Sequence, residues 1–239
     1  MSDFQRYNTQ AQAGVAVDEG LRSYMLGVYN YMAFGIAFTA IASFGMATWA
    51  SANPAVANAL YASPLRWVLM FAPLAFIFLF SATAHKMKAN TARLVFFAFA
   101  GVMGVSMSWI FMVFNLGSIV QIFAITSAAF AGLSLWGYTT KKDISGWGSF
   151  LIMGVIGIIL ASIVNIFLGS GMLSFAINVI GVLLFAGLTA YDTQDIKNMY
   201  FEGDSSEVIK HKQVNGALRL YLDFINMFMM LLQLLGNRE

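Results

Sequence analysis

Two acidic residues lie in apolar segments near the end of the chain, and their positions suggest chemistry. Asp223 lies in ALRLYLDFINMFM (217–229), and Asp192 closes the preceding apolar segment, which ends in GLTAYDTQDIK. Placing a carboxylate in a membrane helix costs about 2.5–3.5 kcal/mol on insertion scales, so such a group usually faces the bundle interior and has a function there. We therefore expect the function to reside in these two aspartates.

The chemistry open to such a pair follows from burial of like charges. Two carboxyl groups within hydrogen-bond distance in a poorly hydrated place cannot both ionise without a large cost, so they tend to share a proton and titrate as a unit. When both are deprotonated, their oxygens are hard ligands that suit a divalent cation such as calcium. Asp192 and Asp223 are thus predicted to sense pH and, when deprotonated, to bind calcium.

Each of these residues also has a structural interpretation. Arg219 precedes Asp223 by four residues, a spacing that allows a local ion pair with the guanidinium reaching toward the cytosol. Asp192 is alternatively a hydrated acid that ends its helix at the membrane interface, and Asp195 fits that role better than a place in the site. Asn226 is a candidate pore-lining residue, although a structural hydrogen bond between helices is favoured for it.

The histidines and the absent motifs bear on enzyme chemistry. His85 ends the second apolar segment at the level of the two acids, where an imidazole responds to pH near neutrality; beside Lys86 and Lys88 it fits an ordinary basic boundary better. His211 lies on a different link, and two histidines without cysteine are too few for a zinc or haem site. With no phosphate-binding glycine loop and no HExxH, we expect neither an enzyme nor a required cofactor.

The elements that position the acids are predicted from composition. Of the 239 residues 59% are hydrophobic and 10% are charged, whereas soluble domains carry about 25% charged residues. This composition predicts that the chain lies in a lipid bilayer. A net charge of +2 is too small to indicate a nucleic-acid partner. Roughly 20 apolar residues span a hydrocarbon core about 30 Å thick. Seven segments meet that length, at about 25–50, 67–84, 94–114, 119–138, 147–168, 172–191 and 216–235.

The sequence therefore predicts an all-α membrane protein with seven transmembrane helices and no soluble domain. Residues 1–22 are expected to form a short, mobile cytosolic tail without the features of a cleaved signal peptide, and residues 23–239 to form the membrane domain. The longest link, 193–215, holds most of the acidic residues and is expected to be solvated.

The orientation follows from the basic residues, which gather in cytosolic loops of membrane proteins. With seven spans, the opposite side of the membrane holds only Arg66 and Arg238. This bias predicts a multi-pass membrane protein with its N-terminus in the cytosol and its C-terminus outside. The basic residues on the cytosolic side are Arg6, Arg22, Lys86, Lys88, Arg93, Lys141, Lys142, Lys197, Lys210 and Lys212.

Three segments together resemble the Bax inhibitor family, also called the transmembrane Bax inhibitor motif family, and its bacterial branch above all. They are GLTAYDTQDIK, ALRLYLDFINMFMMLLQLLG and TTKKDISGWGSFL. The resemblance implies a location in the bacterial plasma (inner) membrane and a compact seven-helix fold with a central seventh helix. It also implies a pH-sensitive calcium leak that is gated by an aspartate pair, which falls on Asp192 and Asp223. It also implies a basic residue of the second helix that ties the pair in the closed state. Residues 76–84 contain no Arg or Lys, so His85 or Arg219 takes that role or the gating differs.

Two further functions remain open beside an ion conductor. The bacterial branch of the family includes members that resemble regulators of a membrane-anchored protease, and the tail over residues 1–20 would be the segment that such a protease grips. An intramembrane aspartyl protease is disfavoured because its second acid lies in a GxGD motif, whereas Leu220 and Leu222 occupy the positions of the glycines before Asp223 here.

Overall fold

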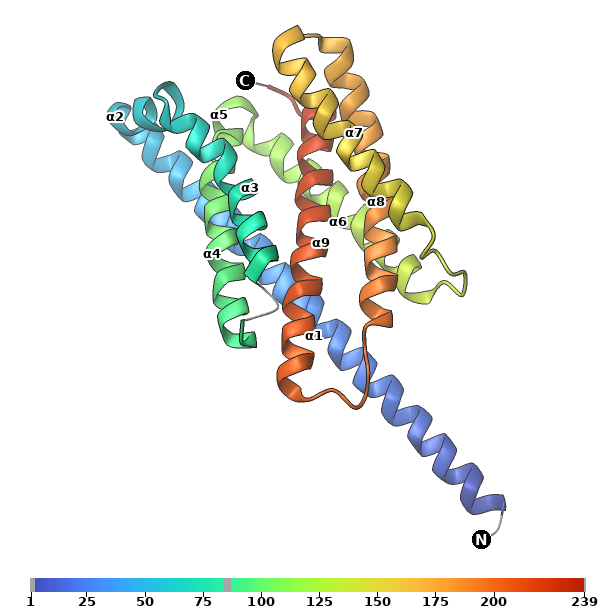
Figure 1. Ribbon diagram of the computed structural model, residues 1–239. Coiled ribbons are helices and arrows are strands. Elements are labelled where there is room, and N and C mark those ends of the chain that lie inside the picture. The colour runs from blue at the N-terminus through green and yellow to red at the C-terminus, as the bar shows by residue number, and fades with distance from the viewer. Residues whose placement is uncertain (1–2, 84–86, 239) are drawn as a thin grey trace.

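The computed structural model describes residues 3–83 and 87–238, without the side chains of 3–18, 79, 81 and 82. The predicted all-α class is confirmed, since every named element in these ranges is a helix. In chain order the elements are α1 (Asp3–Ala52), α2 (Pro54–Ala57), the π-helix η1 (Asn58–Ala62), α3 (Leu65–Thr83), α4 (Ala89–Met107), α5 (Ile110–Val113), α6 (Leu116–Thr139), α7 (Trp147–Leu168), α8 (Gly171–Asn198) and α9 (Ser206–Leu235) (Figure 1).

Six helical stretches in the described part of the chain are long and apolar enough to cross a membrane. A seventh is reached only if Pro54–Ala62 and Leu65–Phe78 count as one span, and these two pieces are bent by 62° relative to each other. Pro73 lies inside α3, which continues past it to Thr83. The six are Glu19–Ala52, Ala89–Val113, Leu116–Thr139, Trp147–Leu168, Gly171–Asn198 and Ser206–Leu235.

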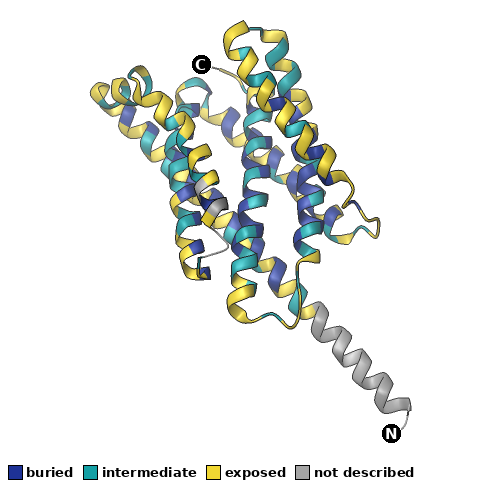
Figure 2. Ribbon diagram, in the orientation of Figure 1, coloured by how far each residue is buried: buried dark blue, intermediate teal, exposed yellow. Residues whose placement is uncertain are grey.

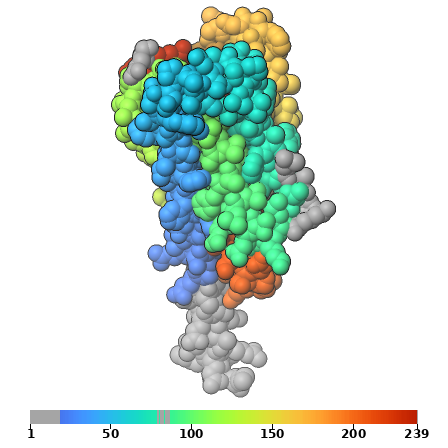
Figure 3. Space-filling model, turned by 90° about the vertical axis from the view of Figure 1, so that its left-hand side faces the viewer, coloured from blue at the N-terminus to red at the C-terminus, as the bar shows by residue number. Residues whose placement is uncertain are grey.

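The path of the chain alternates in direction from one long helix to the next. The end of α1 and the start of α4 lie at opposite ends of the bundle, and α3 descends beside α4 between them (Figure 1). The space-filling view shows α1, the segment from α2 to α3, and α4 together on one face (Figure 3).

The helices extend beyond the predicted membrane segments. The first begins at Asp3 rather than near residue 25, so most of the predicted tail is helical. The predicted solvated link 193–215 is also wrong in extent, because α8 continues to Asn198 and α9 begins at Ser206. The Ser205 side chain accepts a hydrogen bond from the Val208 N–H and caps α9. Hydropathy detects only the apolar part of a helix. For this reason the sequence predicts a start of α1, an end of α8 and a start of α9 that all lie too far inside the apolar segments.

α9 packs against α1, α4, α6 and α8. Half of its most apolar stretch is buried, against 6% for α7, which lies at the edge of the bundle (Figure 2). Tyr221 of α9 is fully buried, with its ring edge-on to Phe96 and Phe99 of α4 at centroid distances of 5.8 and 5.7 Å. Its hydroxyl and that of Thr39 of α1 are 2.7 Å apart. Such packing and interhelical hydrogen bonds hold membrane helices together, since lipid gives no hydrophobic driving force between them.

Glycines allow two of the closest helix contacts. A Cβ on Gly104 of α4 would meet the backbone of Thr39 in α1, and a Cβ on Gly137 of α6 would meet the backbone of Ala190 in α8. The second contact draws α6 against the part of α8 that carries Asp192. At both positions the absence of a side chain lets the two helix backbones approach closely.

Candidate functional site

The two predicted aspartates lie on neighbouring helices and are both buried. Asp192 is 7% exposed near the end of α8, and Asp223 is 4% exposed within α9. These helices are consecutive and pack against each other, and the two carboxyl groups interact electrostatically. The structure thus brings together the pair that the sequence singled out.

Arg219 of α9 forms ion pairs with two acids of α8, one of which is Asp192. Its Nη2 lies 2.5 Å from Oδ1 of Asp192, and its Nη1 lies 2.6 Å from Oδ2 of Asp195. The Arg219 side chain is 32% exposed, so this fork of two ion pairs, from Arg219 to Asp192 and Asp195, lies at the edge of the site rather than in its deepest part. A planar guanidinium that binds two carboxylates in this way fixes their geometry as well as their charge.

This fork corrects two sequence-based interpretations. The local pair of Arg219 with Asp223 is not the hydrogen-bonded arrangement, because both bonds of the guanidinium cross to α8. Asp195 was expected to be a hydrated acid outside the site. Its side chain is 38% exposed, yet it binds the same arginine as Asp192. Asp192 and Asp195 are three residues apart and therefore lie on one face of α8.

Asp223 is the member of the cluster that forms no ion pair with Arg219. Its Oδ2 is buried and has no hydrogen-bond partner among the described residues. Leaving an ionised carboxylate buried and unpaired costs several kcal/mol, whereas a neutral carboxyl is far cheaper to bury. Arg219 already binds two other acids, so Asp223 is the third carboxyl group in a cluster that holds a single cation.

The link between α6 and α7 holds the end of α8 in place. Oε1 of Gln194 accepts a hydrogen bond from the Ile144 N–H at 2.9 Å, and its Nε2 donates to the Lys142 carbonyl at 2.8 Å. The TTKKDISGWGSFL and GLTAYDTQDIK segments are therefore in direct contact. On the exposed side of this link, the Ser145 N–H donates to Asp143, which lowers the pKa of that carboxyl.

An aromatic pair lies over the same end of the bundle. The rings of Tyr24 and Tyr200 have centroids 5.6 Å apart, and Nε2 of Gln213 donates to the Tyr24 carbonyl at 3.2 Å. Tyr24 is 1% exposed and interacts electrostatically with Arg219. Sequence reasoning missed Tyr24, because nothing in the sequence places α1 beside the turn between α8 and α9.

The remaining site predictions have different outcomes. Asn226 donates to the Leu222 carbonyl at 2.8 Å, which is a bond within α9 rather than between helices. His85 lies outside the described residues. In the part of the chain that the structure describes, no group of three or more His, Asp or Glu is arranged to hold a metal ion. A calcium site would therefore rest on the Asp192 and Asp223 carboxyl groups, and one of these is bound to Arg219.

A helical chain with several apolar spans and a buried cluster of acids around an arginine is a multi-pass membrane protein. Its residues 21–239 match the family model described as "Inhibitor of apoptosis-promoting Bax1", and the chain belongs to the Bax inhibitor family.

Bacterial relatives are similar over nearly the whole length. Protein RP147 of Rickettsia prowazekii is 41% identical over 239 residues, covering all of both chains. A protein of Caulobacter vibrioides is 42% identical over 254 residues, again covering all of both chains. The inner membrane protein YbhL of Escherichia coli K12 is 41% identical over 223 residues, which cover 92% of this chain and 94% of YbhL.

Proposed function

We propose that the protein is a pH-sensitive leak channel for calcium, gated by the Asp192 and Asp223 pair, and that it is not an enzyme. The observation that carries the proposal is the position of Asp223, buried without a hydrogen-bond partner at Oδ2 beside an Asp192 that Arg219 already binds. A buried carboxyl in a membrane helix is a functional site by default. The resemblance to the Bax inhibitor family supports the ion and the pH sensing.

The proposal includes a topology of seven spans with α9 central. The chain must return along the bundle between the end of α1 and the start of α4, and α3 is the helix on that path (Figure 1). The distribution of Lys and Arg favours an N-terminus in the cytosol. The inner membrane is proposed as the location because the relative YbhL is named an inner membrane protein.

In the closed state a proton on Asp223 keeps its buried carboxyl neutral while Arg219 binds Asp192 and Asp195. Loss of that proton adds a negative charge four residues from Arg219 on the same helix, within reach of the guanidinium. Asp223 then repels Asp192 and competes for its cation, which weakens the contact between α8 and α9. Arg219 takes the place of the basic residue expected from the second helix, and calcium passes as the transported ion.

Calcium flux into proteoliposomes from pH 6 to 8 tests the proposal. The wild type should leak more as pH rises, and Asp223→Asn should abolish this pH dependence because the amide does not titrate. Asp143→Asn is the matched control, since the hydrogen bond that lowers the pKa of Asp143 keeps this exposed carboxylate ionised throughout that range. Unchanged pH dependence in Asp223→Asn, or a folded wild type with no flux above empty liposomes, would reject the gate.

Regulation of a membrane-anchored protease is the second candidate. Its supporting observation is that α1 begins at Asp3, so the segment that such a protease would grip is helical. Deleting residues 1–20 should abolish regulation and leave ion flux intact, whereas a channel without this role would show no change in proteolysis.

A further inference from the structure

Two cavities follow one another along the gap between α1 and α6. One has a volume of about 590 Å³ and the other about 400 Å³, and both are lined by Ile36 of α1 and Phe224 of α9. Together they form a groove whose walls are α1 and α6 and whose floor is α9. The larger cavity is within the usual size of a small-molecule site, about 300–1,000 Å³.

The larger cavity is open to the side of the bundle, within the membrane-spanning stretches. Leu26 on one wall is 51% exposed and Leu135 on the other is 63% exposed. From Arg22 to Ile36, the two ends of its α1 wall, the helix rises about 21 Å at 1.5 Å per residue. Half of a bilayer of about 40–45 Å, headgroups included, has that same length. The cavity therefore has the reach of one lipid leaflet.

Positive charge lies at one end of this apolar cavity. Arg22 lines it, is exposed, and makes no ion pair with any residue that the structure describes. Lys197 of α8 lies nearby, with Nζ 5.1 Å from the ring centroid of Tyr138, another lining residue. An apolar slot that ends in cations is complementary to a lipid that carries a negative headgroup.

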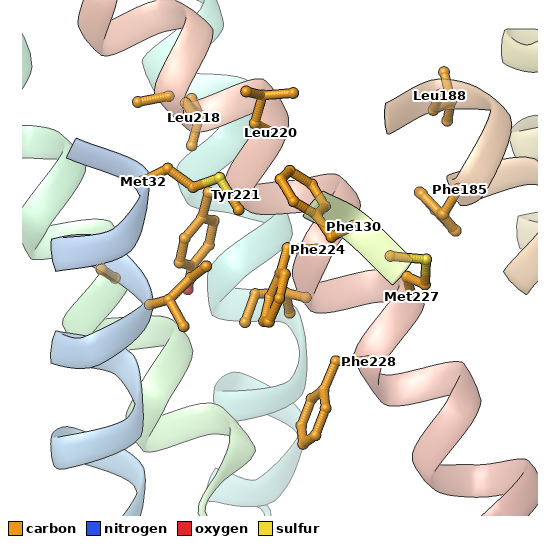
Figure 4. Packing of buried hydrophobic residues seen from close by; sticks show 14 of the residues in the cluster. Met32, Phe130, Phe185, Leu188, Leu218, Leu220, Tyr221, Phe224, Met227 and Phe228 are labelled. Atoms are coloured by element: carbon orange, nitrogen blue, oxygen red, sulfur yellow. The ribbon is translucent and has the colours of Figure 1, made fainter. Parts of the chain in front are cut away.

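The floor of the groove connects it to α9 next to the acid cluster. The Phe224 ring lies edge-on to Phe130 and Phe123 of α6, with centroid distances of 5.6 and 5.5 Å. Figure 4 shows Phe130 and Phe224 facing each other at the contact of these helices. Since Phe224 follows Asp223 directly, a ligand in the groove would touch the residue beside the buried carboxyl.

We infer that this groove binds an anionic phospholipid from the leaflet at the Arg22 end, with the phosphate on Arg22 and one acyl chain extending along α1 and α6 to Phe224. The inference concerns lipid binding and does not depend on ion conduction, so either can fail without the other.

The test is titration of detergent-solubilised protein with phosphatidylglycerol or phosphatidylcholine, with bound lipid counted by native mass spectrometry. The wild type should retain phosphatidylglycerol more strongly than phosphatidylcholine. Arg22→Gln should weaken that binding about fivefold, the effect of one basic residue at a lipid surface, and leave phosphatidylcholine unchanged. Arg93→Gln is the control, because Arg93 is also exposed and basic but lines neither cavity.

Filling the groove tests the acyl chain separately. Ala131 of α6 is exposed and lines the larger cavity, whereas Ala129 is exposed and lines neither. Ala131→Phe should remove binding of both lipids, and Ala129→Phe should not. Ala33→Leu, from the opposite wall, makes the same test if Ala131→Phe fails to fold. Equal lipid binding by the groove variants and their controls would show that the lipid is not held here and would overturn the inference.

Discussion

Arg219 forms an ion pair with Asp192 across the interface of α8 and α9, with 2.5 Å between Nη2 and Oδ1. The same guanidinium holds Asp195, so one cation serves two acids of α8. Asp223 lies on the arginine's own helix but does not accept either bond. This arrangement separates three acids that look alike in sequence into two that are matched by a cation and one that is not.

The first prediction concerns the fork itself. Arg219→Ala should destabilise the protein by about 2 kcal/mol, since breaking a buried pair costs about 3–5 kcal/mol and the partial exposure of this arginine reduces that cost. Adding Asp192→Asn should recover part of the loss, because the orphaned carboxylate is then removed. The free energy of unfolding in detergent, measured for both single variants and the double variant, checks this. Strictly additive losses would show that the two side chains are not coupled.

A second prediction contrasts the two buried aspartates. Asp223→Asn should leave the thermal midpoint unchanged or raise it, because an amide replaces a carboxyl that lacks a charged partner of its own. Asp192→Asn should lower the midpoint, because it removes a charged acceptor of Arg219. Thermal unfolding near neutral pH compares them directly. The reverse order would mean that Asp223 is the acid stabilised by the arginine.

The third prediction concerns Gln194, which positions the end of α8. Gln194→Ala removes two hydrogen bonds to the link between α6 and α7 and leaves the buried Ile144 N–H without its acceptor, at a cost of about 1–3 kcal/mol. Amide hydrogen exchange should therefore accelerate over residues 142–148. Gln233→Ala, at an exposed position of α9, should not change exchange there. Equal protection in both variants would contradict the positioning role.

The fourth prediction uses two glycines of α6. Gly137→Ala should destabilise the bundle, because its Cβ would meet the backbone of Ala190, which cannot move without separating α6 from α8. Gly132→Ala is the matched control, since its Cβ meets nothing within 4 Å and alanine favours a helix by up to about 1 kcal/mol. Thermal stability should fall for the first and hold or rise for the second. A stable Gly137→Ala protein would mean that this contact yields easily.

The sequence by itself determined that this protein has membrane-spanning helices and which acidic residue within them is a candidate for function. Long apolar segments are local features, so hydropathy located each of the spans Ala89–Val113 to Ser206–Leu235. The cost of a carboxylate in lipid is also local, and it singled out Asp223 within its apolar segment before any fold was known. The ends of α8 and α9 were misplaced because helices continue into water, where hydropathy no longer marks them.

Only the tertiary structure decided which groups meet. The spacing of Arg219 and Asp223 allows a local pair, but the packing of α9 against α8 directs the guanidinium to Asp192 and Asp195. Tyr24 joins the site from the other end of the chain for the same reason. Spacing along one helix fixes which residues share a face. The rotation of that face toward a neighbour depends on packing over the whole bundle, and no single segment contains that information.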